Sequence, residues 1–211
     1  MLTKPAILQQ ILAEKVVAII RLNNSKQVIP VVEAVHQGGI SAIEVTMGTP
    51  QALAHLAHYA SHASILIGAG SVLDAETARA AIHAGAKFLV TPVSKRSVIQ
   101  TALRYQVPIF SGAYTPGEIL QAHEWGANVV KVFPADTLGI AYFKAIKAPL
   151  PQLTIMPTGG VTLDNAAQWI QAGACAVGIG SALTDKQAIA EENYARITEN
   201  ARRLMESLRS V

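Results

Sequence analysis

The sequence predicts an α/β protein, a single-domain (β/α)8 TIM barrel with a short N-terminal helix. Eight short apolar runs recur at intervals of roughly 20–25 residues, about the length of one strand–helix unit. Amphipathic segments lie between the runs, and glycine follows several of them, which is typical where a helix ends and a strand begins. The runs are apolar throughout, as expected for parallel strands that are buried on both faces.

The eight runs define the expected strands. They are Val16–Arg21, Ala42–Thr46, Ile65–Gly68, Phe88–Pro92, Pro108–Ser111, Asn128–Phe133, Thr154–Pro157 and Ala174–Gly178. We expect helices between them, for example Lys26–His36, Ala75–Ala84, Arg96–Tyr105, Pro116–Trp125 and Leu163–Ala172. A short helix, Lys4–Ala13, precedes the first strand, and a long one from Lys186 to about Leu208 ends the chain. A doubly wound open sheet is the alternative, but eight evenly spaced units favour closure.

The composition narrows the class of protein. The 211 residues are 51% hydrophobic, which is enough for one well-packed core, so we expect residues 1–211 to form one domain. The net charge is +3, but the basic residues are scattered, so nucleic acid is not an expected partner. One cysteine fits a reducing compartment. Without a signal-peptide pattern or a long apolar stretch, we expect a cytoplasmic location and no membrane span.

Polar residues and glycines gather where the expected strands end. In barrels of this kind the carboxyl ends of the strands carry the active site, so these residues should share one face. One arginine, one carboxylate, one lysine, several hydroxyls and several glycine turns converge there. They include Arg21, Glu44, Thr46, Ser71, Pro92, Ser111, Lys131, Phe133, Thr158, Gly159, Gly160, Gly180 and Ser181.

Lys131 is the most informative of these residues. It lies inside the apolar run Asn128–Phe133, where a charged amine is costly if the strand is buried. Burial lowers the pKa of a lysine, and the neutral amine is the nucleophile that attacks a carbonyl. Lys131 is therefore a candidate Schiff-base lysine, although a lysine whose head reaches solvent or pairs with a carboxylate would show the same pattern.

Glu44 is the one acidic residue expected within a strand. A carboxylate close to a buried lysine could transfer protons, or could form a plain ion pair with it. The turns Thr158-Gly159-Gly160-Val161 and Gly178-Ile179-Gly180-Ser181 follow the last two strands, where backbone N–H groups can approach a phosphate closely. Each turn alone could also be an ordinary tight connection, and the two together indicate a phosphate site.

Two further features, a group of histidines and the single cysteine, are weaker indications of a functional site. His55, His58 and His62 follow one another at helical spacing, which would suit metal ligands. No cysteine or carboxylate joins them, so we expect a solvated outer face of a helix. Cys175 begins the last strand among small apolar residues and is expected to pack in the core.

These residues resemble a known family, the class I aldolases that act on 2-keto-3-deoxy-6-phosphogluconate (KDPG) and 4-hydroxy-2-oxoglutarate (KHG). The similarity covers nearly the whole chain. It is carried by Val17-Ala18-Ile19-Ile20-Arg21, Gly38-Gly39, Ile43-Glu44-Val45-Thr46, Gly68-Ala69-Gly70-Ser71-Val72, Thr91-Pro92, Val130-Lys131-Val132-Phe133-Pro134-Ala135, Pro157-Thr158-Gly159-Gly160-Val161 and Gly180-Ser181.

The resemblance implies a role for each candidate. Lys131 would form the Schiff base and Glu44 would act as general acid/base. Substrate would be bound by Arg21, Thr46, Ser71, Pro92, Phe133, Thr158, Gly159, Gly160, Gly180 and Ser181, with the last four and their backbone holding the phosphate. The resemblance also implies a homotrimer, a small 2-keto acid as substrate, and neither a metal nor an organic cofactor.

The chain departs from the family pattern at two positions. Many members carry an arginine two residues after the threonine of the Glu-Val-Thr motif, where this chain has Gly48. Another group carries it at the end of the first strand, so we expect Arg21 to bind the substrate carboxylate. Ser71 stands where threonine is usual, which keeps the hydroxyl.

The sequence therefore predicts an aldolase that cleaves KDPG to pyruvate and glyceraldehyde 3-phosphate, and KHG to pyruvate and glyoxylate. The 6-phosphogalactonate epimer of KDPG remains an alternative substrate, because the stereochemistry at C4 depends on the exact placement of hydroxyls. Outside aldol chemistry, a phosphate-binding barrel isomerase or epimerase and a non-catalytic sugar-phosphate sensor remain open. Neither of those would require a lysine within a strand.

Overall fold

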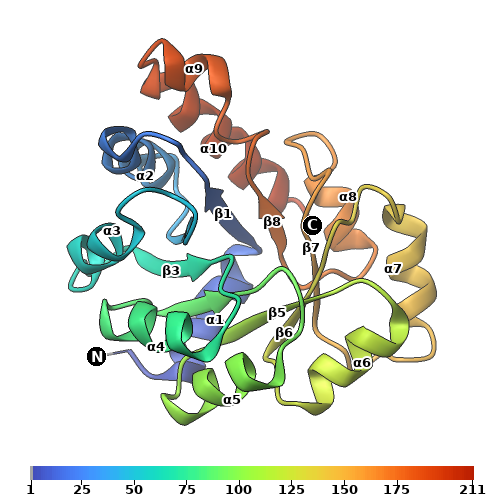
Figure 1. The fold of residues 1–211 in the computed structure, drawn as a ribbon. Coiled ribbons are helices and arrows are strands. Elements are labelled where there is room, and N and C mark those ends of the chain that lie inside the picture. The colour runs from blue at the N-terminus through green and yellow to red at the C-terminus, as the bar shows by residue number, and fades with distance from the viewer. Residues whose placement is uncertain (1) are drawn as a thin grey trace.

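A computed structural model describes residues 2–211 and shows one barrel of eight parallel strands (Figure 1). The strand order is β7-β6-β5-β4-β3-β2-β1-β8. The barrel closes between β7 and β8, where Thr158 bridges Gly178 and the Cys175 N–H donates to the Ile155 carbonyl at 2.9 Å. The strands are β1 (Val16–Ile20), β2 (Ala42–Thr46), β3 (Leu66–Gly70), β4 (Phe88–Val90), β5 (Ile109–Ala113), β6 (Val129–Val132), β7 (Ile155–Pro157) and β8 (Val177–Ile179).

Helices surround these strands (Figure 1). Glycines end four of them, and Gly39, Gly85, Gly126 and Gly173 have φ angles between 97° and 103°, which confirms the predicted helix ends. The helices are α1 (Lys4–Glu14), α2 (Val28–Gln37), α3 (Ala52–Tyr59), α4 (Ala75–His83), α5 (Arg96–Arg104), α6 (Pro116–Glu124), α7 (Gly139–Lys147), α8 (Ala166–Gln171), α9 (Lys186–Ala190) and α10 (Tyr194–Arg209), with a 3-10 turn η1 (Ser25–Gln27) before α2.

Two apolar cores hold the barrel together. Alternate strand residues point outward and pack beneath the helices, while the other residues point into the barrel. The inner core fills the end of the barrel where the strands begin and is covered there by α1. It consists of Val17, Ala42, Leu66, Phe88, Val90, Phe110, Val129, Met156 and Ala176, together with Ile7 and Ile11 of α1.

The helix α1 is positioned by its own ends. The Thr3 hydroxyl caps its first turn, Pro5 occupies a position where no N–H is needed, and Lys15 ends it with a φ of 59°. The Glu14 carboxylate accepts the Ser41 N–H at 2.9 Å, which ties α1 to the start of β2. Cys175 packs against this inner core, as expected, and burial raises the pKa of its thiol to about 12, which is the pattern of an inert thiol.

Two expectations were wrong. The predicted long terminal helix is two helices, because the chain turns at Glu192, whose φ is 54°, and Asn193 then caps α10. His55 is buried rather than solvated, and its Nε2 lies 2.9 Å from the Ser25 hydroxyl, while His58 and His62 are exposed as expected.

The helices in residues 2–211 are all too short or too polar to cross a membrane.

Candidate active site

Along several strands, the inward-pointing residues change from apolar to polar toward the carboxyl end. The parallel register places Ile19 beside Glu44, Glu44 beside Gly68, and Gly112 beside Lys131. These residues form the layer directly above the inner core. Arg21, Thr46, Gly70, Phe133, Thr158 and Gly180 continue the same inward parity at the strand ends. The alternation therefore brings the predicted lysine, carboxylate and arginine to one end of the barrel. Ser111 has the opposite parity and lies against Ser94, with 3.1 Å between their hydroxyl oxygens.

Lys131 is held in β6 with only 6% of its surface exposed. Burial lowers the pKa of its ammonium and the nearby positive charge of Arg21 lowers it further, while the negative charge of Glu44 opposes the shift. Its Nζ lies 5.2 Å from the centroid of the Phe133 ring, so Phe133 forms one wall beside the amine. This environment favours the neutral, nucleophilic amine.

Glu44 lies in the middle of β2 and is 1% exposed. Burial raises the pKa of its carboxyl, and the positive charges of Lys131 and Arg21 only partly counteract this effect. Within residues 2–211, no oxygen of Glu44 lies within 4 Å of the Lys131 amine, and Oε2 has no hydrogen-bond partner. The pair is thus close enough to interact electrostatically without forming a direct ion pair. Glu44 keeps an oxygen free for a substrate or a water molecule.

A glycine makes room for this carboxylate. A Cβ atom added at Gly70, at the end of β3, would lie 1.7 Å from Glu44 Oε1. The Gly68-Ala69-Gly70 sequence therefore serves the site, because any side chain at position 70 would displace the carboxylate.

A cavity of about 360 Å³ opens beside this pair, between the ends of β1, β7 and β8. Seven of the predicted site residues line it, namely Arg21, Phe133, Thr158, Gly159, Gly160, Gly180 and Ser181. Arg21 and Lys186 are the ionisable side chains of the lining, and no carboxylate belongs to it. The cavity therefore suits an anionic ligand.

The wall formed by β7 and β8 depends on close packing. The Thr158 hydroxyl is buried without a hydrogen-bond partner among residues 2–211, and a Cβ at Gly178 would lie 2.3 Å from it. Gly159 and Gly160 have φ angles of 92° and 70°, in the left-handed region that favours glycine. A Cβ at Gly160 would also lie 2.5 Å from that of Asp136. The turn can thus present its backbone to the cavity only with glycine at these positions.

The remaining predicted residues lie outside the cavity lining. These are Lys131, Glu44, Thr46, Ser71 and Pro92. The Thr46 hydroxyl lies 3.1 Å from that of Thr49, and both side chains are buried. Ser71 has a φ of 56°, a strained conformation for a residue other than glycine.

The chain around Pro92 crosses directly over β5. A Cβ at Gly112 would lie 2.2 Å from the Pro92 carbonyl, so the close approach requires glycine there. The Gly112 N–H donates to the Thr91 hydroxyl at 3.0 Å, which fixes this crossing. Because Gly112 pairs with Lys131, the Pro92 backbone lies over the strand next to the amine.

The cavity lining also includes Val161 and Gly178 of the two predicted phosphate turns. Sequence reasoning missed Ile19, Leu22, Thr184, Lys186 and Ile189, which line the cavity as well. The inward parity of Ile19 could have indicated it. Lys186 could not have been found, because the expected long helix placed it on a surface. No three His, Cys, Asp or Glu side chains of residues 2–211 are grouped so that they could hold a metal ion.

The fold and this site define a (β/α)8 barrel with a buried lysine and a buried carboxylate beside a cavity whose ionisable lining residues are cations. The sequence matches the family described as KDPG and KHG aldolase over residues 7–200. The chain belongs to this family and is an aldolase, a carbon–carbon lyase.

Similar proteins include members with different substrates. A 2-dehydro-3-deoxy-phosphogluconate aldolase of Treponema pallidum is 34% identical over 87% of this chain and 89% of its own length. A 2-dehydro-3-deoxy-6-phosphogalactonate aldolase of Escherichia coli is 37% identical over 79% of this chain and 83% of its own. The crystal structure of the KDPG aldolase of Legionella pneumophila, with pyruvate captured as a covalent carbinolamine, has a TM-score of 0.86 and 29% identity, and the match covers 96% and 98% of the two chains.

Proposed function

We propose that this protein is a Schiff-base aldolase that cleaves KDPG to pyruvate and glyceraldehyde 3-phosphate. The observation that carries the proposal is the buried Lys131 amine, next to a buried carboxylate with a free oxygen and a cavity whose ionisable residues are cations. The pyruvate carbinolamine of the Legionella relative supports the same chemistry for this family.

The reaction would begin at the Lys131 amine. Neutral Nζ attacks the C2 ketone and forms a carbinolamine, and loss of water then leaves an iminium ion. Glu44, through a water molecule at its free Oε2, accepts the proton of the C4 hydroxyl. The C3–C4 bond breaks, its electrons move toward the iminium nitrogen, and the aldehyde leaves. Protonation of the resulting enamine and hydrolysis of the imine release pyruvate and restore the lysine.

Arg21 would hold the carboxylate of the keto acid during these steps. Its side chain lines the cavity and its charge lowers the pKa of both Lys131 and Glu44, which supports a position near the reacting carbons. A guanidinium binds a carboxylate through two parallel hydrogen bonds, and it would also oppose protonation of the amine. The arginine at the end of β1 would thus replace the one that many family members carry at the position of Gly48.

The first experiment is mass spectrometry after incubation with pyruvate and borohydride. We expect a reduced pyruvyl adduct on Lys131, and neither adduct nor turnover in a folded Lys131→Ala variant. Folded wild-type protein without an adduct at saturating pyruvate would remove the Schiff base. That result would favour the isomerase, epimerase or sensor interpretation.

Two substrates compete with KDPG. The galactonate relative from Escherichia coli favours the C4 epimer as one alternative, and the family description favours KHG as another. Initial rates of pyruvate release from KDPG, its 6-phosphogalactonate epimer and KHG would rank the three. A kcat/KM for either competitor above that for KDPG would overturn the substrate assignment.

We further propose that this chain acts as a homotrimer. Leu73, Val93 and Tyr114 follow the neighbouring strands β3, β4 and β5 and are 47%, 50% and 38% exposed. Adjacent exposed apolar side chains are typical of an interaction surface. Sedimentation equilibrium should give three times the chain mass, whereas a monomer at micromolar concentration would contradict the proposal.

A further inference from the structure

Lys186 is a basic side chain of the cavity that neither Schiff-base chemistry nor carboxylate binding requires. It begins α9, directly after the turn that follows β8, and lines the cavity together with Ser181 and Thr184. Within residues 2–211, its ammonium takes part in no hydrogen bond or ion pair with other side chains or carbonyls. The charge is therefore available to a ligand.

The two cations of the cavity occupy different environments. Arg21 follows β1 two residues after Ile19, which pairs with Glu44, whereas Lys186 begins α9 beyond the turn that follows β8. The register thus puts Arg21 on the side of the Lys131–Glu44 pair, and Lys186 lies at the rim formed by the β8 turn. A substrate with an anionic group at each end would contact both cations, with its keto-acid carboxylate at Arg21.

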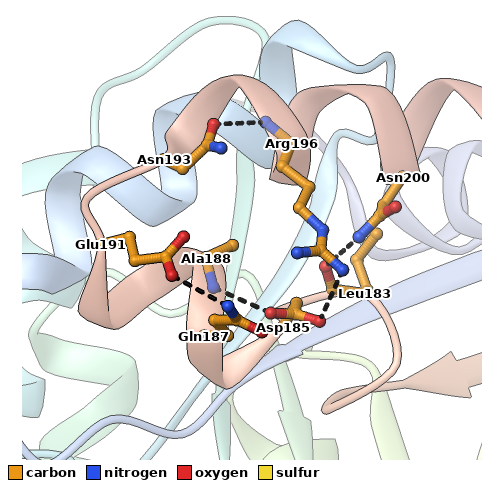
Figure 2. Close-up of polar contacts among 8 residues, drawn as sticks. All are labelled: Leu183, Asp185, Gln187, Ala188, Glu191, Asn193, Arg196 and Asn200. Atoms are coloured by element: carbon orange, nitrogen blue, oxygen red, sulfur yellow. Dashed lines mark hydrogen bonds and ion pairs between the residues drawn. The ribbon is translucent and has the colours of Figure 1, made fainter.

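Asp185, the acidic residue that precedes Lys186 in the chain, is engaged with other partners. The Asp185 carboxylate accepts the Ala188 N–H at 2.8 Å and pairs with the Arg196 guanidinium of α10 at 3.4 Å (Figure 2). Asp185 is not part of the cavity lining. It therefore does not neutralise Lys186 at the cavity, and it anchors the beginning of α9.

Further contacts hold the turn between β8 and α9 and the start of α10 (Figure 2). The Asn200 side chain donates to the Leu183 carbonyl at 3.4 Å, and Asn193 caps α10 by accepting the Arg196 N–H at 3.2 Å. The Thr184 N–H and hydroxyl both donate to the Gly180 carbonyl, at 2.9 Å and 3.1 Å. These contacts fix the turn after β8, so Lys186 is presented from a defined backbone position at the edge of the cavity.

We infer that Lys186 is a specificity-determining residue, which binds the terminal phosphate of the substrate and favours phosphorylated over unphosphorylated keto acids. The inference rests on the proposed function and refines its substrate class. A lysine supplies a point charge and up to three hydrogen-bond donors to a phosphate. Because the side chain is exposed, its contribution should be at the low end for a charged hydrogen bond, about tenfold in kcat/KM.

The test compares KDPG with 2-keto-3-deoxygluconate, which lacks the phosphate. In Lys186→Ala the ratio of the two kcat/KM values should fall about tenfold, and Lys186→Arg should retain most of the wild-type ratio. Lys144→Ala, which removes an exposed lysine of α7 outside the cavity, is the matched control and should keep the ratio. An unchanged ratio in a natively folded Lys186→Ala variant would overturn the inference.

Two further measurements distinguish failure of the proposed role of Lys186 from failure of the proposed aldolase function. Calorimetric binding of glycerol 3-phosphate needs no turnover, and its Kd should rise about tenfold in Lys186→Ala. Equal Kd values in the two proteins would contradict the role of Lys186 even if aldolase activity is confirmed. A larger loss for KHG than for KDPG would assign Lys186 to a terminal carboxylate and overturn its assignment to phosphate. Wild-type protein that releases no pyruvate from any of these keto acids would refute the proposed function itself.

Discussion

The substitution Gly70→Ala should displace the Glu44 carboxylate while leaving the other residues of the site in place. The added Cβ would lie 1.7 Å from Glu44 Oε1, whereas non-bonded carbon atoms attract best at about 3.5–4.0 Å. The carboxylate must therefore move by on the order of 1–2 Å. A misplacement of about 1 Å can cost roughly 10²-fold, so we expect kcat for aldol cleavage to fall about 10²-fold.

The cost to stability should be smaller than the cost to activity. Overpacking of this kind costs about 1–3 kcal/mol, and the lower backbone entropy of alanine in the unfolded chain offsets about 0.4–1 kcal/mol. For a chain of this size each 1 kcal/mol lowers Tm by about 2–4 °C. The variant should therefore remain folded at 25 °C while losing most of its turnover.

Turnover is measured by coupling pyruvate release to a reductive indicator reaction. Tm is measured separately by circular dichroism. Gly117→Ala is the matched control, because a Cβ at this position in α6 has no neighbour within 4 Å. It should leave kcat unchanged. Wild-type kcat in a folded Gly70→Ala variant would refute the reasoning that the position of Glu44 limits the reaction.

Three other variants test the site and a helix end. Arg21→Ala should raise KM for pyruvate at least about tenfold, and an unchanged KM would show that the carboxylate binds elsewhere. The same variant should move the acid limb of the kcat/KM profile to higher pH. The reaction needs a neutral Lys131 amine and an ionised Glu44 carboxylate, and the Arg21 charge lowers the pKa of both groups. Superimposable pH profiles of the variant and the wild type would contradict this prediction. Glu44→Gln should lower kcat by about 10²–10⁴-fold in single-turnover measurements, and an unchanged kcat would show that another group transfers the proton. Thr115→Ala should remove the capping box of α6 and cost about 1 kcal/mol in urea unfolding, with activity retained.

Much of this protein follows from local sequence patterns. The apolar runs specify the strands because both faces of a parallel barrel strand are buried, and the glycines that end helices are needed at positive φ. Lys131 and Glu44 could be selected because a charge within such a run is costly and requires a reason. Strand parity and the shared direction of the strands then place both residues at the same end of the barrel.

Other features depended on packing between distant segments. The burial of His55 depends on Ser25, thirty positions earlier, and the requirement for glycine at positions 70, 112 and 178 depends on the side chains and backbone of neighbouring strands. Lys186 lines the cavity as the first residue of the short helix α9, which the turn at Glu192 separates from α10 and which the Asp185–Arg196 pair ties to α10. By itself the sequence determined the barrel and singled out Lys131 and Glu44, since periodicity and the cost of burying charge are local properties. The tertiary structure alone decided which charges face the substrate and how closely they approach, because those distances are set by contacts between residues far apart in the chain.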